Sequence, residues 1–258
     1  MDRNTIAAIT TDLLNCNSKD QVNLIKKRYE AYNHPYKYYI LGSAYDLHND
    51  NQNAFHNYLN AAKFGIVYPN DFYNTYFSDS IGSSLYYLLK RYNYNQLNAE
   101  IIRKMFFISY IYLTDTIHFA QKLNIKAFES LENRAYLLAK FEHGYSQLLC
   151  GEYLNPFTFG NVLFISDFYY AFEAYQEKGD IHRANILFEN AKKIHNSLED
   201  VNIEGIPASE YSLPEIADKG RDRHEFINQN IQRPFFNGEF NINEEFYLRE
   251  LTKSVQLS

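Results

Sequence analysis

The spacing of apolar residues constrains this chain most, because it is helical from residue 4 to about residue 199. Ile101, Ile102, Met105 and Phe106 recur at intervals of three and four, and so do the apolar residues from Leu131 to Tyr145. Such intervals place side chains on one face of an α-helix, whereas strands alternate with a period of two. Nothing in this stretch alternates as a strand would, so the sequence predicts an all-α fold.

Helix-starting and helix-breaking residues divide this stretch into many helices. The starts are marked by Ser18 with Gln21 in capping-box spacing, Pro35, Asn51 after Asp50, and Asp180 after Gly179. Strong breakers are few between residues 42 and 151, so neighbouring helices should be joined by short turns and pack antiparallel. We expect helices over residues 3–15, 19–32, 35–48, 51–65, 70–77, 79–92, 96–114, 116–123, 126–150, 159–178 and 180–197.

Two stretches of the sequence match each other at an offset of 130 residues. Positions 4, 7, 8, 11, 20, 24 and 27 of a 34-residue unit hold Tyr38, Leu41, Gly42, Tyr45, Ala54, Tyr58 and Ala61 in the first copy, and Phe168, Ala171, Phe172, Tyr175, Ala184, Phe188 and Ala191 in the second. Small residues at positions 8, 20 and 27 let two antiparallel helices approach closely, and rings at positions 4, 11 and 24 fill the space around them. This pattern resembles the tetratricopeptide repeat, which implies an α-α superhelix of antiparallel helix pairs.

The sequence departs from the family pattern in three respects. Phe172 stands where a small residue is usual, neither copy has a proline at position 32, and residues 71–157 carry no readable motif. The alternative fold is a generic helical bundle in which Ala and Tyr recur because helices pack.

The resemblance also implies where a partner would bind. In this family the first helix of each pair lines a concave face, chiefly through positions 2, 5, 9, 12 and 13. These positions hold Tyr36, Tyr39, Ser43, Asp46 and Leu47 in the first copy, and Ser166, Tyr169, Glu173, Gln176 and Glu177 in the second. They lack the Lys, Asn and Arg that clamp a C-terminal carboxylate in the family's best-known binding mode, so a chaperone-tail adaptor is not expected. An aromatic and acidic groove favours a basic or amphipathic protein or peptide, unless these tyrosines only support the next helix.

The chain changes character after Val201. Gly205, Pro207, Pro214, Gly220, Pro234 and Gly238 punctuate it, which leaves room for short helices around 215–230 and 243–255. Residues 199–258 hold twelve acidic and six basic side chains, whereas the rest of the chain holds nineteen of each. We expect a helical-repeat domain over residues 1–200 and an acidic, partly irregular segment over residues 201–258 that packs on the domain or extends from it.

Charge and hydropathy argue against nucleic-acid and membrane partners. The balanced body of the chain has no basic surplus for a phosphate backbone. The longest apolar run, from Met105 to Leu113, is well short of the roughly twenty residues that span a bilayer. The N-terminus lacks the layout of a secretory signal, and Cys16 and Cys150 suggest no disulfide framework. We therefore expect a cytoplasmic protein.

Catalytic and metal-binding motifs are missing from the sequence. It has no HExxH, GxSxG, P-loop or dinucleotide fingerprint, so no cofactor is predicted. His48 and His56 could approach one another across a turn, but no cysteine or paired carboxylate completes a metal site. The densest charged cluster is residues 221–225, where His224 has the chemistry of a general base. A solvated helix start with local ion pairs explains this cluster better.

Three functions follow from these observations. We expect a protein- or peptide-binding scaffold or adaptor without catalysis, with Tyr39, Tyr169 and Glu173 as its leading contacts. The second function is a regulatory peptide sensor or an immunity-type inhibitor, in which the acidic C-terminal segment covers a basic partner or occupies the groove itself. The third is an enzyme with a helical active site around His224.

Overall fold

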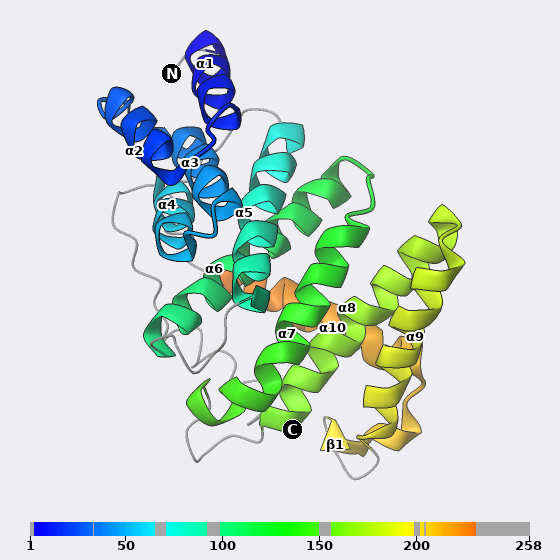
Figure 1. Cartoon of the computed structure of the whole chain (residues 1–258). Coiled ribbons are helices and arrows are strands. Elements are labelled where there is room, and N and C mark those ends of the chain that lie inside the picture. Colours follow the sequence, from blue (N-terminus) through cyan, green and yellow to red (C-terminus); the bar gives the residue numbers. More distant parts are fainter. Residues whose placement is uncertain are drawn as a thin grey trace. The chain divides into compact units, whose positions relative to one another are not determined.

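A computed structural model describes residues 3–32, 34–64, 71–91, 99–149, 156–198, 202–203 and 205–230. Within these ranges the chain is mostly α-helical, which confirms the all-α prediction (Figure 1). The helices are α1 (Arg3–Leu14), α2 (Lys19–Arg28), α3 (Pro35–Leu47), α4 (Asn51–Phe64), α5 (Asp71–Arg91), α6 (Ala99–Lys122), α7 (Phe128–Leu149), α8 (Pro156–Lys178), α9 (Ile181–Asn196) and α10 (Leu213–Asn230). Between α9 and α10, β1 (Asn202–Ile203) pairs antiparallel with β2 (Ile206–Pro207), and a single 3-10 turn follows.

The predicted helix starts are present with their caps. The Ser18 hydroxyl accepts a hydrogen bond from the Gln21 amide, and Pro35 occupies the first turn of α3. Asp50 and Asp180 each accept from a backbone amide three residues later, which satisfies a donor that the helix leaves unpaired. Local capping therefore accounts for the starts of α2, α3, α4 and α9.

Two predicted helix boundaries, near residues 78 and 115, are wrong. The structure has continuous helices α5 and α6 at these places. In α5 the Ser80 hydroxyl donates to the Tyr76 carbonyl one turn back, so this serine stays inside the helix. In α6, Thr114 is buried and its hydroxyl oxygen accepts from Arg134, so its polar group serves a tertiary contact. The predicted helix over residues 243–255 lies outside the described residues.

The described chain divides into two compact units, one ending at Tyr112 and the other beginning at Leu113. The boundary falls inside α6. Three described helices, α5, α6 and α7, separate the hairpin α3–α4 from the hairpin α8–α9. The first copy of the repeat pattern lies in the first unit and the second copy in the second unit. The predicted domain boundary at residue 200 stays a prediction.

In the first unit, α3 and α4 pack against each other as an antiparallel hairpin, and α5 packs against α4. The Tyr36 ring near the start of α3 stacks on Phe77, and Asp46 near its end binds Arg91 at the end of α5. The Tyr112 hydroxyl of α6 donates to the Ala62 carbonyl of α4 at 2.9 Å. These contacts link α3 to α5 and α4 to α6 within the first unit.

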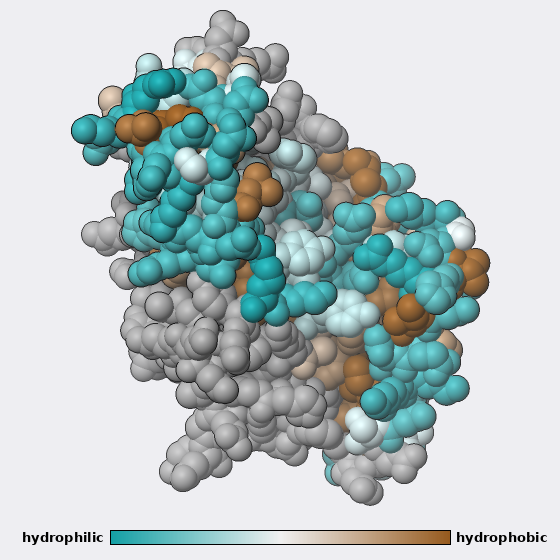
Figure 2. All heavy atoms as spheres, in the orientation of Figure 1, coloured by the Kyte–Doolittle hydropathy of each residue, from teal (hydrophilic) through white to brown (hydrophobic). Residues whose placement is uncertain are grey.

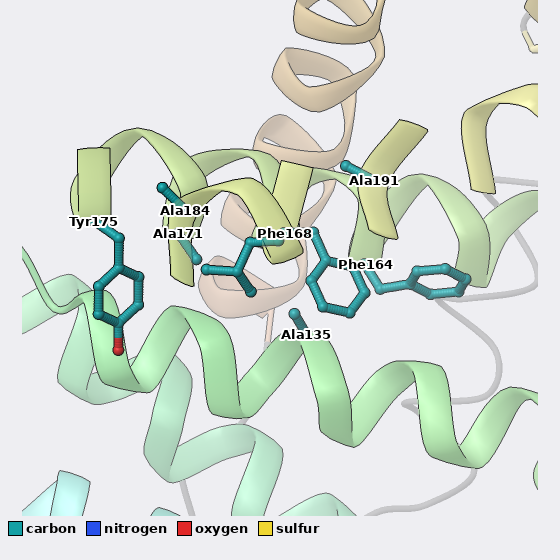
Figure 3. Close-up of a cluster of buried hydrophobic side chains, with 8 residues drawn as sticks. Ala135, Phe164, Phe168, Ala171, Tyr175, Ala184 and Ala191 are labelled. Carbon is teal, nitrogen blue, oxygen red and sulfur yellow. The ribbon is translucent and has the colours of Figure 1, made fainter. Parts of the chain in front are cut away.

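In the second unit, α8 packs between α7 and α9 and carries α10 on a further side. Five of the predicted positions of the second copy form one buried cluster with Ala135 of α7, namely Phe168, Ala171, Tyr175, Ala184 and Ala191 (Figure 3). Phe172 is partly buried against this cluster. The Tyr175 hydroxyl points toward α7, where it donates to Glu132 at 2.8 Å (Figure 3). No helix among the described residues is both long enough and apolar enough to cross a bilayer.

Candidate functional site

The hairpin of the first copy is held by a close contact between Gly42 and Tyr58. A Cβ atom at residue 42 would lie 2.6 Å from the Tyr58 ring, so a glycine is required there. Ala54 and Ala61 are fully buried, as the repeat pattern predicts for positions 20 and 27. In the second copy the Phe172 ring instead lies 4.8 Å from the Phe188 ring, which explains how a large residue is accommodated at position 8.

Three predicted contact residues of the first copy form a row on α3. The Tyr36 ring meets Tyr39 edge-on at 6.0 Å, and Tyr39 lies 6.0 Å from the Tyr58 ring. The Ser43 hydroxyl donates to the Tyr39 carbonyl and accepts from the Tyr58 hydroxyl. Burial raises the pKa of Tyr58 to about 12, so its hydroxyl remains a donor at neutral pH. The row is half-buried and therefore presents firmly held aromatic area.

The far end of this row carries an ion pair and exposed apolar surface. Asp46 accepts a hydrogen bond from Arg91 of α5 at 2.5 Å. Leu47 is 73% exposed, and Tyr87, one turn before Arg91, is 48% exposed. Sequence reasoning missed α5 here because α5 carries no repeat motif. Together we call the following residues the α3–α5 face: Tyr36, Tyr39, Ser43, Asp46, Leu47, Tyr87 and Arg91.

The surface around α1–α4 is mostly hydrophilic on the side shown in Figure 2, and its hydrophobic residues form separate patches. Large permanent interfaces bury continuous apolar surface. A surface of separate patches set among polar groups instead suits a small interface with a few strong contacts.

In the second copy, α10 covers the start of the equivalent face of α8. Ser166, a predicted contact position, is buried against Gly220. A Cβ atom at residue 220 would lie 2.2 Å from the Val162 carbonyl oxygen and 2.5 Å from the Ser166 Cβ. The close approach of α10 therefore requires glycine, and Ser166 is shielded from any partner, contrary to the prediction.

The remaining predicted residues of the second copy follow one another along α8. Tyr169 is half-buried with its ring 5.8 Å from Phe172, and Glu173 is half-buried one turn later. Burial and the neighbouring Glu173 raise the pKa of the Tyr169 hydroxyl. Gln176 is exposed. Their role in partner binding stays a prediction.

A buried polar cluster joins four helices of the second unit. Arg134 of α7 binds Asp167 of α8 through two hydrogen bonds, Nε to Oδ2 at 2.7 Å and Nη2 to Oδ1 at 2.6 Å, and its Nη1 donates to Thr114 of α6 at 2.9 Å. His224 of α10 places Nε2 3.3 Å from Asp167 Oδ1 and 3.1 Å from the Leu163 carbonyl oxygen. Both partners are acceptors, so Nε2 carries the proton. We call this the Arg134–Asp167–His224 cluster.

The Arg134–Asp167–His224 cluster is better suited to holding helices together than to acid–base catalysis. Burial alone would raise the pKa of Asp167, but the charge of Arg134 and the hydrogen bonds from Arg134 and His224 outweigh it and lower this pKa. Burial and the charge of Arg134 lower the pKa of His224, which is 4% exposed. A neutral buried histidine whose Nε2 proton is already donated is poorly placed to exchange protons with a substrate.

The prediction of a solvated helix start at residues 221–225 is wrong, because these residues lie in the middle of α10. The local ion pairs that it included are present, since Arg221 pairs with Asp218 and Asp222 at the surface. The sequence places Arg134 and Asp167 inside apolar helical stretches, which is a signal that they are buried. It does not show that these two residues, 33 positions apart, pair with each other.

The pKa shifts in this cluster predict that acid destabilises the protein. His224 has an ordinary pKa of 6.5 that folding lowers, so below that pH the unfolded chain binds a proton that the native chain does not. Stability attributable to His224 should therefore fall from pH 7.5 to pH 5.5, by at most about 1.4 kcal/mol. Urea unfolding at the two pH values measures this loss, and His224→Gln should show a smaller one. Equal losses in both proteins would contradict the assignment.

The described residues contain no group of three or more His, Cys, Asp or Glu side chains that could hold a metal ion. His48, which ends α3, and His56, which is exposed on α4, belong to no such group. Comparison of the chain with protein-family models, curated proteins and solved structures finds no match, so its candidate site is defined by its own residues.

Proposed function

We propose that this protein binds an amphipathic segment of another protein or peptide through the α3–α5 face. The observation that carries the proposal is the arrangement of exposed Leu47 and Tyr87 beside the half-buried row of Tyr36 and Tyr39. Firmly held aromatic rings supply contact area at little cost in conformational entropy. Arg91 neutralises Asp46, so apolar contacts and hydrogen bonds, more than net charge, would select the partner.

The second unit offers an intramolecular example of this kind of binding. There α10 lies along α8, the first helix of the second copy, and buries Ile216 and Ala217 completely. The polar residues Asp218 and Arg221 stay at the edge of this contact, where both reach the Tyr170 hydroxyl. An amphipathic helix is thus the kind of element that such a face accommodates.

The regulatory alternative, in which the C-terminal segment is a removable cover, receives less support. Ile216 of α10 belongs to a buried cluster with Val162, Ile165, Leu198 and Ile203. Detaching α10 would expose this cluster to water, at a free-energy cost of about 25 cal/mol for each Å² of apolar surface. A segment that completes a hydrophobic core is better explained as a permanent part of its unit.

Selection of a displayed peptide library on the full chain tests the proposal. We expect enriched peptides to place apolar residues at i, i+3 or i+4, and i+7, as in a helix bound in a groove. Replacing Leu47 and Tyr87 together by alanine should lower the affinity for the best peptide by at least about tenfold, because few residues carry most of an interface's binding energy. Fluorescence anisotropy of the labelled peptide gives both dissociation constants.

Tyr32→Ala is the matched control for this experiment. Tyr32 is 44% exposed, and its ring packs on Tyr29 rather than on the α3–α5 face. The control should bind the peptide as wild type does. The proposal fails if the Leu47→Ala, Tyr87→Ala variant keeps wild-type affinity, or if the enriched peptides have no helical apolar pattern.

A further inference from the structure

A cavity of about 490 Å³ lies between α2 and α3, on a different side of α3 from the row of Tyr36 and Tyr39. Its volume falls within the range of small-molecule sites, roughly 300–1,000 Å³. We call it the α2–α3 pocket. The residues that decide its chemistry are Lys26, Lys27, Glu30, Lys37, Tyr38 and Leu41.

Lys37 is the unusual member of the α2–α3 pocket because it is only 4% exposed. Its ammonium donates to the Tyr29 carbonyl at 3.3 Å and lies 4.6 Å from the centre of the Tyr38 ring. Among the described residues no carboxylate comes within ion-pair distance of it, although Glu30 acts on it from further away. Burial and the charge of Lys26 lower the pKa of Lys37, against the opposing effect of Glu30.

The second copy of the repeat pattern shows how such a charge is balanced elsewhere in this chain. The residue equivalent to Lys37 at the 130-residue offset is Asp167, which is also buried. Its counter-charge comes from Arg134 on α7, the preceding helix. The helix that precedes α3 is α2, and it presents Lys26 and Lys27 to the pocket instead of a carboxylate. The helix dipole favours lysines at the end of α2, but it does not account for Lys37.

From this arrangement we infer that the α2–α3 pocket binds a small molecule carrying a phosphate group. Three lysines against one glutamate leave two positive charges in the pocket. A phosphate monoester carries about −1.5 to −2 at pH 7, which matches this surplus, whereas a carboxylate carries only one negative charge. The Tyr38 ring and Leu41 would contact the apolar part of the ligand. This inference is independent of the α3–α5 face.

Phenyl phosphate, which joins a ring to a phosphate, is a suitable probe of the full chain in isothermal titration calorimetry at low ionic strength. We expect one saturable site with a dissociation constant on the order of 0.1–1 mM. Benzoate, with the same ring and a single negative charge, should bind at least about tenfold more weakly. The inference is overturned if phenyl phosphate shows no saturable binding, or if benzoate binds equally well.

Two variants locate the binding. Replacing Lys26 and Lys27 together by glutamine should lower the affinity for phenyl phosphate at least about tenfold. Replacing Lys192 and Lys193 on α9, two exposed lysines, by glutamine makes the same change of net charge and should leave the affinity within about twofold. Equal weakening by both variants, or by neither, would overturn the assignment to this pocket.

Lys37→Met adds a readout that does not depend on a ligand. Methionine keeps most of the side-chain volume but removes the buried charge, so we expect lost phenyl phosphate binding with stability unchanged or increased. A large loss of stability would show that the chain already satisfies this ammonium, and it would end the argument for an anionic ligand.

Discussion

Asp167→Asn is expected to lower the free energy of unfolding by about 3–5 kcal/mol, one of the largest effects of any substitution in the described chain. Asparagine is nearly the same size as aspartate but carries no charge, so Arg134 would keep a buried positive charge without its counter-ion. Arg134 and Asp167 are 4% and 1% exposed, so water cannot replace the missing carboxylate. Urea unfolding followed by circular dichroism at neutral pH measures the loss.

Glu177→Gln is the control for this substitution. It also removes a carboxylate from an ion pair, with Lys126, but the two side chains are 63% and 53% exposed. Exposed ion pairs contribute less than about 1 kcal/mol, so this variant should remain close to wild type. Similar losses in the two variants would show that burial does not make the Arg134–Asp167–His224 cluster important for stability.

Gly220→Val is expected to separate α10 from α8 and to lower stability by about 3 kcal/mol. Even the first carbon of a side chain would lie 2.2 Å from the Val162 carbonyl oxygen, and a backbone atom inside a helix cannot move aside. Separation would also remove the contact of His224 with Asp167. Hydrogen exchange of the α10 amides should accelerate more than exchange of the α7 amides, because the change acts first on α10.

Asp222→Val separates the steric clash from any general effect of a valine in α10. Asp222 is exposed on the same helix, and valine and aspartate have similar helix propensities, so this substitution introduces valine without a steric clash. A change within about 0.5 kcal/mol is expected. The steric explanation would be refuted if Asp222→Val accelerated exchange in α10 as much as Gly220→Val did.

The two hairpins were predictable because their determinants are close together in the sequence. The alanines at positions 20 and 27 and the rings around them sit at fixed helical intervals, and the structure buries Ala54, Ala61, Ala184 and Ala191 as predicted. Capping works over three residues, so the starts of helices were predictable as well.

The parts that could not be predicted depend on contacts between distant segments. In the sequence, Thr114 suggests a helix boundary, but in the structure it lies inside α6 and accepts a hydrogen bond from Arg134. Ser166 suggests a surface position, but α10 covers it. Likewise, His224 stands in a charged sequence, yet it is buried because its own helix packs on α8. Tyr87 and Arg91 were added to the candidate site only because Arg91 of α5 forms an ion pair with Asp46 of α3. Helical periodicity predicts which face is buried, but it does not identify the helix that buries it.

Because α6 crosses from the first compact unit into the second, neither unit ends at a loop on that side. Severing the chain between Tyr112 and Leu113 would break about four backbone hydrogen bonds of the helix. It would also place Tyr112 and Leu113, both buried, at the new chain ends. Fragments meant to retain their native fold must each include the whole of α6, so the two halves of this protein can be studied separately only as overlapping pieces.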